Sequence, residues 1–171
     1  EGMSPKAVAK AILDNKVTAM MAVASIYASM AKLDSSQFPS LGVLRMAESG
    51  GMHVVPPLAQ RFKERFGLPI TPVWGSTETT GIIMARPWDG VFKPGSVGKP
   101  CPHYEIALTN EEGEMVGDNE IGELTVKGPA VCSGYYRNPE ETALHMKNGW
   151  MHTGDLFKRD EDGYYFFAGI K

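Results

Sequence analysis

Short apolar segments alternate with amphipathic ones over the first half of the chain, and few folds accommodate that order. A helix is expected at residues 56–66, because Leu58, Phe62 and Phe66 share one face and Gly67 follows the last turn. Further helices are expected at residues 4–15 and 25–33, and strands at 17–23, 42–47 and 70–74. Strands that alternate with helices predict βαβ units and a parallel sheet.

The composition changes between residues 86 and 102, where prolines and glycines interleave. Beyond this segment the pattern is one of short strands bounded by turn residues, at 104–109, 123–127, 156–158 and 164–167, with one helix at 139–146. We therefore expect an α/β chain in which a parallel-sheet βαβ lobe, residues 1–88, is followed by a small β-rich, barrel-like lobe, residues 89–171.

Charge and cysteine content exclude several classes of protein. The chain carries 17 Lys and Arg against 20 Asp and Glu, a net charge of −3, so no nucleic-acid-binding surface is indicated. Residues 17–31 form the longest stretch without a charge, which is shorter than the roughly 20 residues of a membrane helix, so no membrane span is expected. Cys101 and Cys132 form no CxxC motif, and we expect a reducing, cytoplasmic location.

The segment with the most chemical content is residues 74–81, Trp-Gly-Ser-Thr-Glu-Thr-Thr-Gly, which follows an expected parallel strand. In open α/β sheets, ligands bind beyond the carboxyl ends of the strands. The hydroxyls of Ser76, Thr77, Thr79 and Thr80, together with nearby backbone N–H groups, could donate to a phosphate. Glu78 could hold a divalent cation that bridges to it. A hydrophilic turn with a solvated glutamate fits the same composition, so both interpretations stay open.

Two shorter segments are also candidates for ligand contact. Gly50 and Gly51 follow an expected strand and permit close approach of a ligand to the backbone, although a tight turn has the same composition. Asp155, after Thr153 and Gly154, could accept two hydrogen bonds from a ribose diol, although a turn-forming aspartate fits equally.

Six segments occur in a characteristic order: SGG at 49–51, WGSTETTG at 74–81, GSVGKP at 95–100, GELTVKGP at 122–129, GYYRNPEET at 134–142 and GWMHTGD at 149–155. Their order and spacing resemble the adenylate-forming (AMP-binding) superfamily, in particular its acyl-CoA synthetase branch. The resemblance covers essentially the whole chain. It implies an internal fragment of the large N-terminal domain of such an enzyme, running from the C-terminal part of an α/β subdomain into a β-rich subdomain.

The resemblance implies a set of residues that bind ATP or AMP: Gly50, Gly51, Trp74, Gly75, Ser76, Thr77, Asp155 and Phe167. Within it, Trp74 matches the aromatic position beside the adenine, Asp155 the carboxylate that binds the ribose, and Phe167 a hydrophobic position near the ribose. Thr77 matches the residue that contacts the adenylate phosphate, and Glu78 matches the Mg²⁺-binding glutamate. Thr77 and Glu78 are therefore the expected catalytic residues, and Glu78 the expected metal ligand.

The implied reaction joins a fatty or aryl carboxylic acid to CoA. The carboxylate attacks the α-phosphate of ATP to give acyl-AMP and pyrophosphate, and the thiol of CoA then displaces AMP. Charge accumulates at the α-phosphate, where donors from Thr77 and Mg²⁺ on Glu78 would stabilise it. ATP, Mg²⁺ and CoA are thus the implied cofactors.

The chain also departs from the family pattern. The Gly/Ser/Thr-rich phosphate loop and the C-terminal domain with the adenylation lysine are absent, so we expect the fragment to be inactive without the remainder of its polypeptide. Ile170 stands where the family usually has an arginine that contacts the nucleotide. Two alternatives therefore remain: an adenylation domain that loads a carrier protein, and a catalytically degenerate nucleotide-binding or scaffold paralogue. Ile170 favours the second, whereas Thr77, Glu78 and Asp155 disfavour it.

Overall fold

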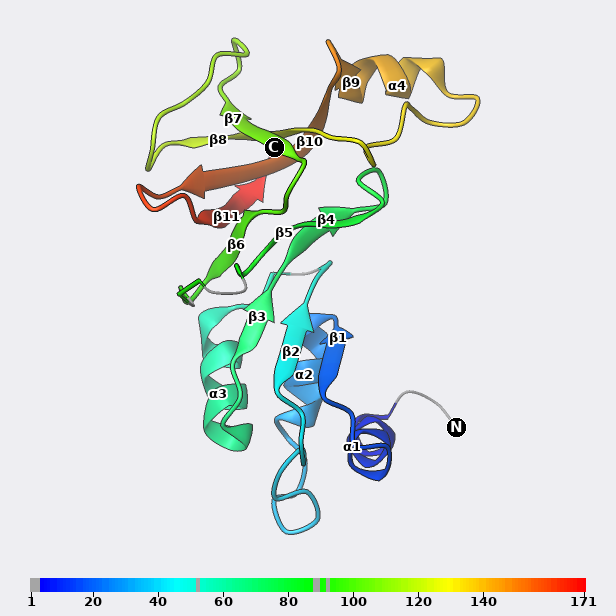
Figure 1. Ribbon diagram of the computed structural model, residues 1–171, viewed down its shortest axis with the longest axis vertical. Coiled ribbons are helices and arrows are strands. Elements are labelled where there is room, and N and C mark those ends of the chain that lie inside the picture. The colour runs from blue at the N-terminus through cyan, green and yellow to red at the C-terminus, as the bar shows by residue number, and fades with distance from the viewer. Residues whose placement is uncertain (1–3, 52, 88–89, 92) are drawn as a thin grey trace. The chain divides into compact units, whose positions relative to one another are not determined.

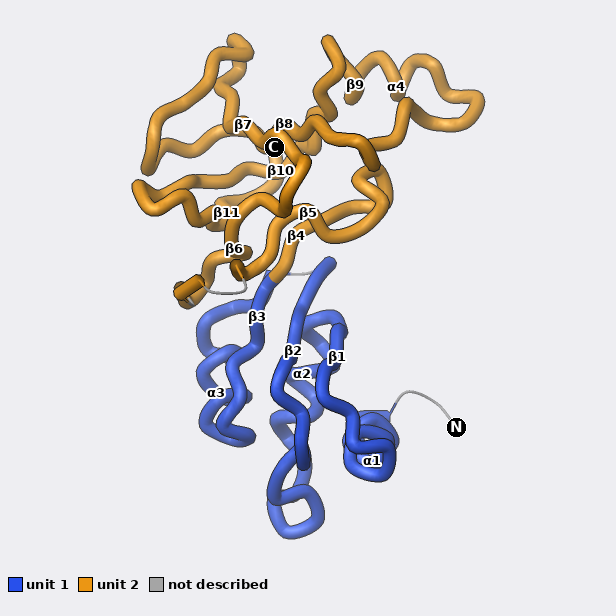
Figure 2. Tube along the Cα trace, in the orientation of Figure 1, with its two compact units in different colours: residues 1–72 blue, residues 73–171 orange. Residues whose placement is uncertain are grey.

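The computed structural model of the protein describes residues 4–51, 53–87, 90–91 and 93–171. Two compact units divide the chain between Pro72 and Val73 (Figure 2). The expected boundary at residues 88 and 89 lies outside the described residues. The units divide earlier in the chain because the segment after Val73 pairs into the antiparallel sheet of the C-terminal unit.

The N-terminal unit is built on a parallel sheet with the strand order β1-β2-β3, which confirms the βαβ prediction (Figure 1). Helices α2 and α3 lie in the connections between these strands, and α1 precedes them. The elements are α1 (Pro5–Asp14), β1 (Ala19–Ala22), α2 (Ala24–Met30), β2 (Met46–Ser49), α3 (Pro56–Phe66) and β3 (Ile70–Pro72).

Aromatic packing forms the core of this unit. Tyr27 of α2 and Phe62 of α3 are fully buried and meet edge to face, with ring centroids 5.1 Å apart. The Tyr27 hydroxyl donates to the carbonyl of Glu48 at 2.7 Å, which ties α2 to β2. Helix α3 ends as predicted, because Gly67 adopts a left-handed conformation with φ of 70°.

The second strand differs from its prediction. The sequence predicted a strand at residues 42–47, whereas β2 begins at Met46 and ends at Ser49. Leu41 and Leu44 are buried in the core from the preceding loop rather than from a strand. A prediction from apolar residues alone therefore starts this strand too early. Ser49 of the SGG motif is the last residue of β2.

The C-terminal unit is an antiparallel sheet with the strand order β4-β5-β6-β11-β10-β8-β7, and β9 pairs with β10. This arrangement confirms the predicted β-rich lobe. Its core contains Ile83, Met84, Leu124, Val126 and Phe157, all fully buried. The elements are β4 (Trp74–Ser76), β5 (Gly81–Ala85), β6 (Ser96–Pro100), β7 (Glu105–Thr109), β8 (Ile121–Lys127), α4 (Pro139–His145), β9 (Met146–Lys147), β10 (Trp150–Arg159) and β11 (Tyr165–Ile170).

The motif at residues 74–81 is a β-hairpin and not the expected loop after a parallel strand. The parallel strand β3 ends at Pro72, and β4 then pairs antiparallel with β5. The two backbones approach closely at Gly75, where a Cβ atom would lie 2.0 Å from the carbonyl oxygen of Gly81. A glycine is therefore required at position 75 by the hairpin itself.

The helices of the described residues are short. The longest, α3, has 11 residues, and none has both the length and the apolar character needed to cross a membrane.

Candidate functional site

The turn between β4 and β5 is closed by the side chain of Thr79. Its hydroxyl oxygen accepts from the Ser76 N–H at 2.9 Å. It also lies 3.0 Å from the Ser76 carbonyl and 2.8 Å from the Gly81 carbonyl, one of which takes its proton. Thr79 is only 1% exposed, so the expectation that its hydroxyl donates to a phosphate is wrong. This buried hydroxyl fixes the turn, so that Thr77 is exposed and Glu78 partly exposed on its outer side.

The segment before α4 anchors the same turn from the other side. The Cys132 N–H donates to the Glu78 carbonyl, and the Thr80 hydroxyl donates to the Ala130 carbonyl, both at 2.7 Å. These bonds join residues about fifty positions apart. The backbone of the turn is thus held by hydrogen bonds within the protein.

The Glu78 carboxylate is held by Tyr135, whose hydroxyl donates to Oε1 at 2.8 Å. Partial burial opposes ionisation of Glu78, but hydrogen bonds from its own N–H and from Tyr135 outweigh it and lower its pKa below the ordinary value. Burial and the bond to Glu78 raise the pKa of Tyr135 to about 12. At neutral pH the pair is therefore a carboxylate and a neutral phenol donor.

A single ionised carboxylate suits one kind of metal site. Among the described residues, no three His, Cys, Asp or Glu side chains gather to form an all-protein metal cage. Mg²⁺ is typically held by one or two carboxylates together with substrate phosphates and water. Glu78, ionised and on the outer side of a rigid turn, fits that donor set.

Trp74 and Asp155 meet across the unit. The Trp74 Nε1–H donates to Asp155 Oδ2 at 2.7 Å, although the two residues are 81 positions apart. Trp74 also packs edge to face on Phe157, with centroids 6.0 Å apart, and Phe157 packs in the same way on Phe167 at 5.5 Å. Phe157 is fully buried and supports the rings of Trp74 and Phe167, which are both partly exposed. The exposed part of Trp74 gives apolar surface beside a carboxylate, a combination suited to a base and its sugar.

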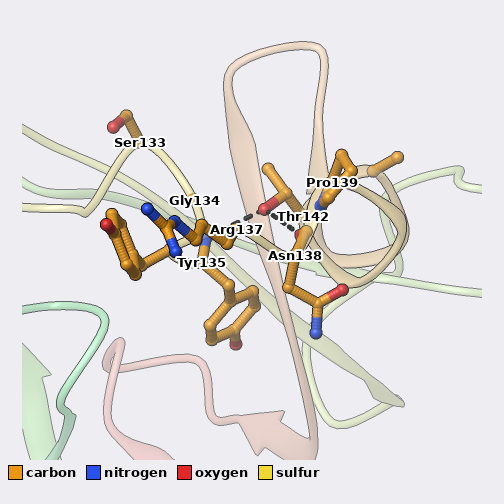
Figure 3. A pocket seen from close by; sticks show the side chains of 9 residues that line it. Ser133, Gly134, Tyr135, Arg137, Asn138, Pro139 and Thr142 are labelled. Carbon is orange, nitrogen blue, oxygen red and sulfur yellow. Dashed lines mark hydrogen bonds between the residues drawn. The ribbon is translucent and has the colours of Figure 1, made fainter.

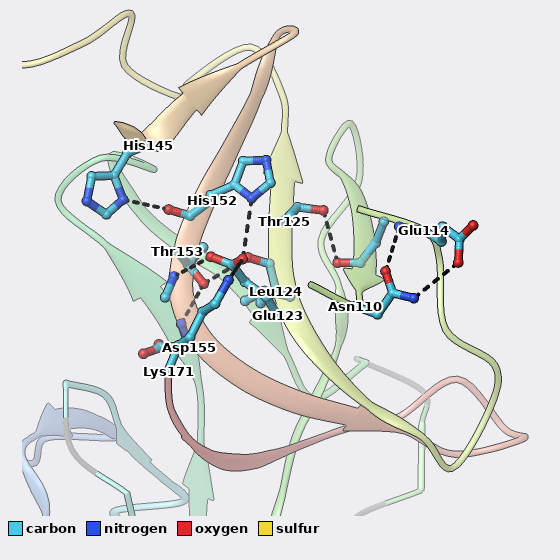
Figure 4. A network of polar contacts seen from close by, with 12 residues as sticks. Asn110, Glu114, Glu123, Leu124, Thr125, His145, His152, Thr153, Asp155 and Lys171 are labelled. Atoms are coloured by element: carbon cyan, nitrogen blue, oxygen red, sulfur yellow. Dashed lines mark hydrogen bonds and ion pairs between the residues drawn. The ribbon is translucent and has the colours of Figure 1, made fainter. Parts of the chain in front are cut away.

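Asp155 lies in an irregular part of β10. The register of β10 against β8 shifts between His152 and Leu156. Within the irregular part, the Thr153 hydroxyl donates to the Leu124 carbonyl at 2.9 Å and accepts from the Asp155 N–H at 3.0 Å (Figure 4). The side chain of Thr153 thus fixes the backbone that carries Asp155.

The structure brings most of the predicted site residues into the C-terminal unit. Trp74, Gly75, Ser76, Thr77 and Glu78 share one hairpin, Asp155 contacts that hairpin through Trp74, and Phe167 joins through Phe157. Gly50 and Gly51 belong to the N-terminal unit, where they follow β2. The Ser76 Oγ is buried, and the Ser76 side chain contributes to the lowered pKa of the Glu78 carboxylate.

Ile170 lies directly opposite Asp155 in the register of β10 and β11. Its side chain is 78% exposed. An arginine at this position would therefore emerge beside the Asp155 carboxylate, and isoleucine supplies no charge there.

Sequence reasoning missed two residues that contact the candidate site or the backbone beside it. Tyr135 belongs to the GYYRNPEET motif and Glu123 to GELTVKGP, but neither was assigned a role. Glu123 lies in the predicted strand 123–127, and a glutamate in a strand that is buried indicates a partner, because Glu is rarely buried without one. For Tyr135 the motif alone carried no indication of its contact with Glu78.

A hollow of about 650 Å³ lies next to Tyr135 and is lined by residues 133–139 and by Thr142 and Ala143 (Figure 3). The Thr142 hydroxyl accepts from the Tyr135 N–H and donates to the Asn138 carbonyl, both at 2.8 Å. These bonds close the loop onto α4. The walls of the hollow come from one continuous segment of the chain, and its lining residues include none of the predicted site residues.

Solved structures with the same fold include several CoA ligases. An anthranilate CoA ligase in complex with anthranoyl-AMP matches with a TM-score of 0.90 and 31% identity, covering 99% of this chain and 33% of that one. A benzoate CoA ligase from Burkholderia xenovorans LB400 matches with a TM-score of 0.88 and 30% identity, covering 99% of this chain and 35% of that one. The chain therefore has the fold of these ligases over about a third of their length.

The model of the AMP-binding enzyme family matches residues 1–136, and the chain belongs to that family. A luciferin 4-monooxygenase from Photinus pyralis is 37% identical over 93% of this chain and 29% of its own length. A long-chain-fatty-acid–CoA ligase from Bacillus subtilis is 33% identical over 95% of this chain and 29% of its own length. The chain thus spans about three tenths of the length of these relatives.

Proposed function

We propose that the full-length protein containing this chain is an AMP-forming acid–CoA ligase. It activates a carboxylic acid with ATP to form acyl-AMP and then transfers the acyl group to CoA. The observation that carries the proposal is the ionised Glu78, fixed on a rigid turn next to the exposed hydroxyl of Thr77. The kinship with CoA ligases over nearly the whole chain supports it.

In this proposal the turn acts on the phosphates of ATP. Mg²⁺ bound at Glu78 would supply positive charge to the α-phosphate as the acid attacks it. Thr77, exposed on the same turn, donates its hydroxyl to an oxygen of that phosphate, and Ser76 and Gly75 complete the wall of the site. Because the turn is already hydrogen-bonded at Thr79 and Cys132, it needs little reorganisation when charge develops.

The nucleoside occupies the aromatic side of the site. Asp155 accepts from the ribose hydroxyls, Phe167 lies near the sugar and Trp74 near the adenine. Trp74 has a second task here, because its Nε1–H donates to Asp155 and orients the carboxylate. The motif resemblance alone also assigns Gly50 and Gly51 to nucleotide binding.

We infer that the acid is a fatty or an aryl acid, since the relatives include long-chain-fatty-acid–CoA ligases, a benzoate CoA ligase and an anthranilate CoA ligase. Cys101 and Cys132 are free thiols, which supports a cytoplasmic location. The chain spans only part of such ligases, so we expect it to be inactive when separated from the remainder of its polypeptide.

The test is acid-dependent exchange between ATP and pyrophosphate by the full-length protein, over a panel of fatty and aryl acids. Glu78→Gln should reduce the exchange rate by about two orders of magnitude or more, because removal of one group that stabilises charge in the transition state typically has an effect of this size. Glu140→Gln is the matched control, because Glu140 is an exposed glutamate on α4. Exchange that persists in Glu78→Gln at the wild-type rate would refute the assignment, and CoA consumption with the active acid tests the second step.

One observation favours a second candidate, a nucleotide-binding protein that does not form adenylates. Ile170 leaves the strand position opposite Asp155 without a positive charge. ATP binding without exchange for any acid of the panel would support this candidate. Acyl-AMP formation without transfer to CoA would instead indicate an adenylation domain that loads a carrier protein.

A further inference from the structure

The peptide groups on both sides of Gly154, the residue before Asp155, are fixed by hydrogen bonds. The Gly154 N–H donates to Glu123 Oε1 at 3.1 Å, and the Gly154 carbonyl accepts from the Lys171 N–H at 2.8 Å. The peptide that joins Gly154 to Asp155 is thus held by Lys171, the residue after β11, and the preceding peptide is held by a side chain of β8. The position of Asp155 depends on both contacts.

The local backbone explains why a side chain is needed. His152 of β10 pairs with Thr125, and Leu156 pairs with Glu123, so two more residues of β10 than of β8 lie between these pairs. Gly154 has a φ of 74°, in the left-handed region. The N–H of Gly154 therefore does not meet a carbonyl of β8 in regular register, and the Glu123 carboxylate accepts from it instead.

Glu123 is 8% exposed and has three donors around its carboxylate. Oε1 accepts from Gly154, while Oε2 lies 3.0 Å from Lys171 Nζ and 3.4 Å from His152 Nδ1. Burial opposes its ionisation, but the bonds from Lys171, Gly154 and His152 lower its pKa below the ordinary value. The buried group is therefore charged and paired.

We propose that Glu123 is a positioning residue for Asp155, with Lys171 as its counter-ion. The carboxylate of Glu123 holds the Gly154 backbone, and through it sets the place from which Asp155 reaches the ribose. The ion pair joins Glu123 of β8 to Lys171, the residue after β11. The two strands that flank β10 are thus both linked to its irregular part at Gly154. This inference rests on the proposed role of Asp155 in nucleotide binding.

A second ion pair on the same sheet shows what a purely structural pair looks like. Glu105 Oε1 of β7 lies 3.2 Å from Lys127 Nζ of β8, and both side chains are about half exposed or more. This pair bridges two strands in regular register. Glu105→Gln is therefore the matched control for Glu123→Gln, since both remove one carboxylate from an ion pair of this sheet.

The experiment measures how the full-length protein discriminates ATP from 2′-deoxy-ATP and 3′-deoxy-ATP in acid-dependent pyrophosphate exchange. The wild-type protein should prefer ATP, and Asp155→Ala should lose the preference. Glu123→Gln should raise the KM for ATP about three- to tenfold, as expected when a charge-assisted hydrogen bond is lost, with a smaller change in kcat. It should also reduce the preference for the ribose hydroxyls, whereas Glu105→Gln leaves it intact.

Two further variants keep the inference open to refutation. Lys171→Met removes only the counter-ion from a half-exposed position, so it tests the ion pair even if Glu123→Gln fails to fold. It should lower the ribose preference in the same direction. The double variant Glu123→Gln/Asp155→Ala should be no worse in KM than Asp155→Ala, because both changes act on one contact.

The outcomes separate this inference from the proposed function. A preference that Asp155→Ala abolishes, but that both Glu123→Gln and Lys171→Met retain, would overturn the positioning role and leave the ligase proposal standing. A wild-type protein that exchanges pyrophosphate without preferring the ribose hydroxyls would remove the role of Asp155, and that of Glu123 with it. A protein that shows no exchange at all contradicts the proposed function itself.

Discussion

Tyr135→Phe removes one oxygen atom from the neighbourhood of the proposed metal ligand. The hydroxyl that donates to Glu78 Oε1 at 2.8 Å is lost. The ring keeps its edge-to-face contact with His145, the Tyr135 N–H still donates to Thr142, and the Cys132 N–H still donates to the Glu78 carbonyl. The substitution therefore loosens the carboxylate and leaves the turn in place.

The expected loss of Mg²⁺ affinity follows from the hydrogen bond that Glu78 loses. A hydrogen bond to a charged group contributes about 1.5–3 kcal/mol, and partial exposure of Glu78 reduces this to about 1 kcal/mol. A loss of about 1 kcal/mol in Mg²⁺ binding is about a fivefold change in affinity. We expect the Mg²⁺ concentration at half-maximal pyrophosphate exchange to rise about fivefold in Tyr135→Phe, with the rate at saturating Mg²⁺ little changed.

The same substitution has a pH signature. The pKa of Glu78 lies below its ordinary value of 4.5, partly through the Tyr135 hydrogen bond, so Mg²⁺ binding is complete above that value and is lost as the pH falls through the lowered pKa. Without the hydroxyl the pKa rises, and Mg²⁺ binding should be lost at a higher pH than in the wild-type protein. Titration of the Mg²⁺ requirement between about pH 3 and 7 measures this shift.

The control is Tyr136→Phe, because the neighbouring Tyr136 is 86% exposed and makes its ring contact with Arg137 rather than with Glu78. An unchanged Mg²⁺ requirement in a folded Tyr135→Phe protein would refute the orienting role of Tyr135. A lowered requirement would show the reverse relation, in which the hydroxyl competes with the cation for the carboxylate.

Two further substitutions test the electrostatics and the packing of the site. Ile170→Arg places a positive charge opposite Asp155. We expect the KM for ATP in exchange assays to fall about two- to fivefold, because the charge pair would be largely exposed. An unchanged or higher KM would argue against a missing positive charge at this position. Phe157→Ala empties a fully buried position between two aromatic rings and should cost about 3–5 kcal/mol of unfolding free energy, measured from the urea dependence of tryptophan fluorescence. A loss below about 1 kcal/mol would show that the neighbouring rings collapse into the space.

The helices were predictable because their signals are local. In α3 the apolar stripe, the two prolines at the start and Gly67 at the end all lie within one short stretch of sequence. The N-terminal sheet followed from the alternation of such helices with apolar runs. The start of β2 was not predictable in this way, because Leu41 and Leu44 are buried in the core although they lie in a loop.

The hairpin at residues 74–81 could not be predicted from its own composition. Its small and hydroxylated residues are typical of a loop, and the strand pairing depends on Met84 and on the buried hydroxyl of Thr79. The contacts of the site are still less local, since Tyr135 meets Glu78 across 57 positions and Trp74 meets Asp155 across 81. Family resemblance assigned Trp74, Glu78 and Asp155 to one site, but only the structure shows which atoms of them touch.

The buried hydroxyl of Thr79 bears on how motifs are used to find active sites. In the run from Ser76 to Gly81, Thr79 faces inward and its neighbour Thr77 faces outward, yet the two are the same letter two positions apart. The two threonines therefore have different roles: Thr79 serves the fold, and the proposed function assigns Thr77 to ligand contact. The role of a threonine in such a run cannot be read from the letter alone, and valine substitution distinguishes the two roles. We expect Thr79→Val to disrupt the turn in the absence of any nucleotide, whereas Thr77→Val should alter the protein only when a nucleotide is bound.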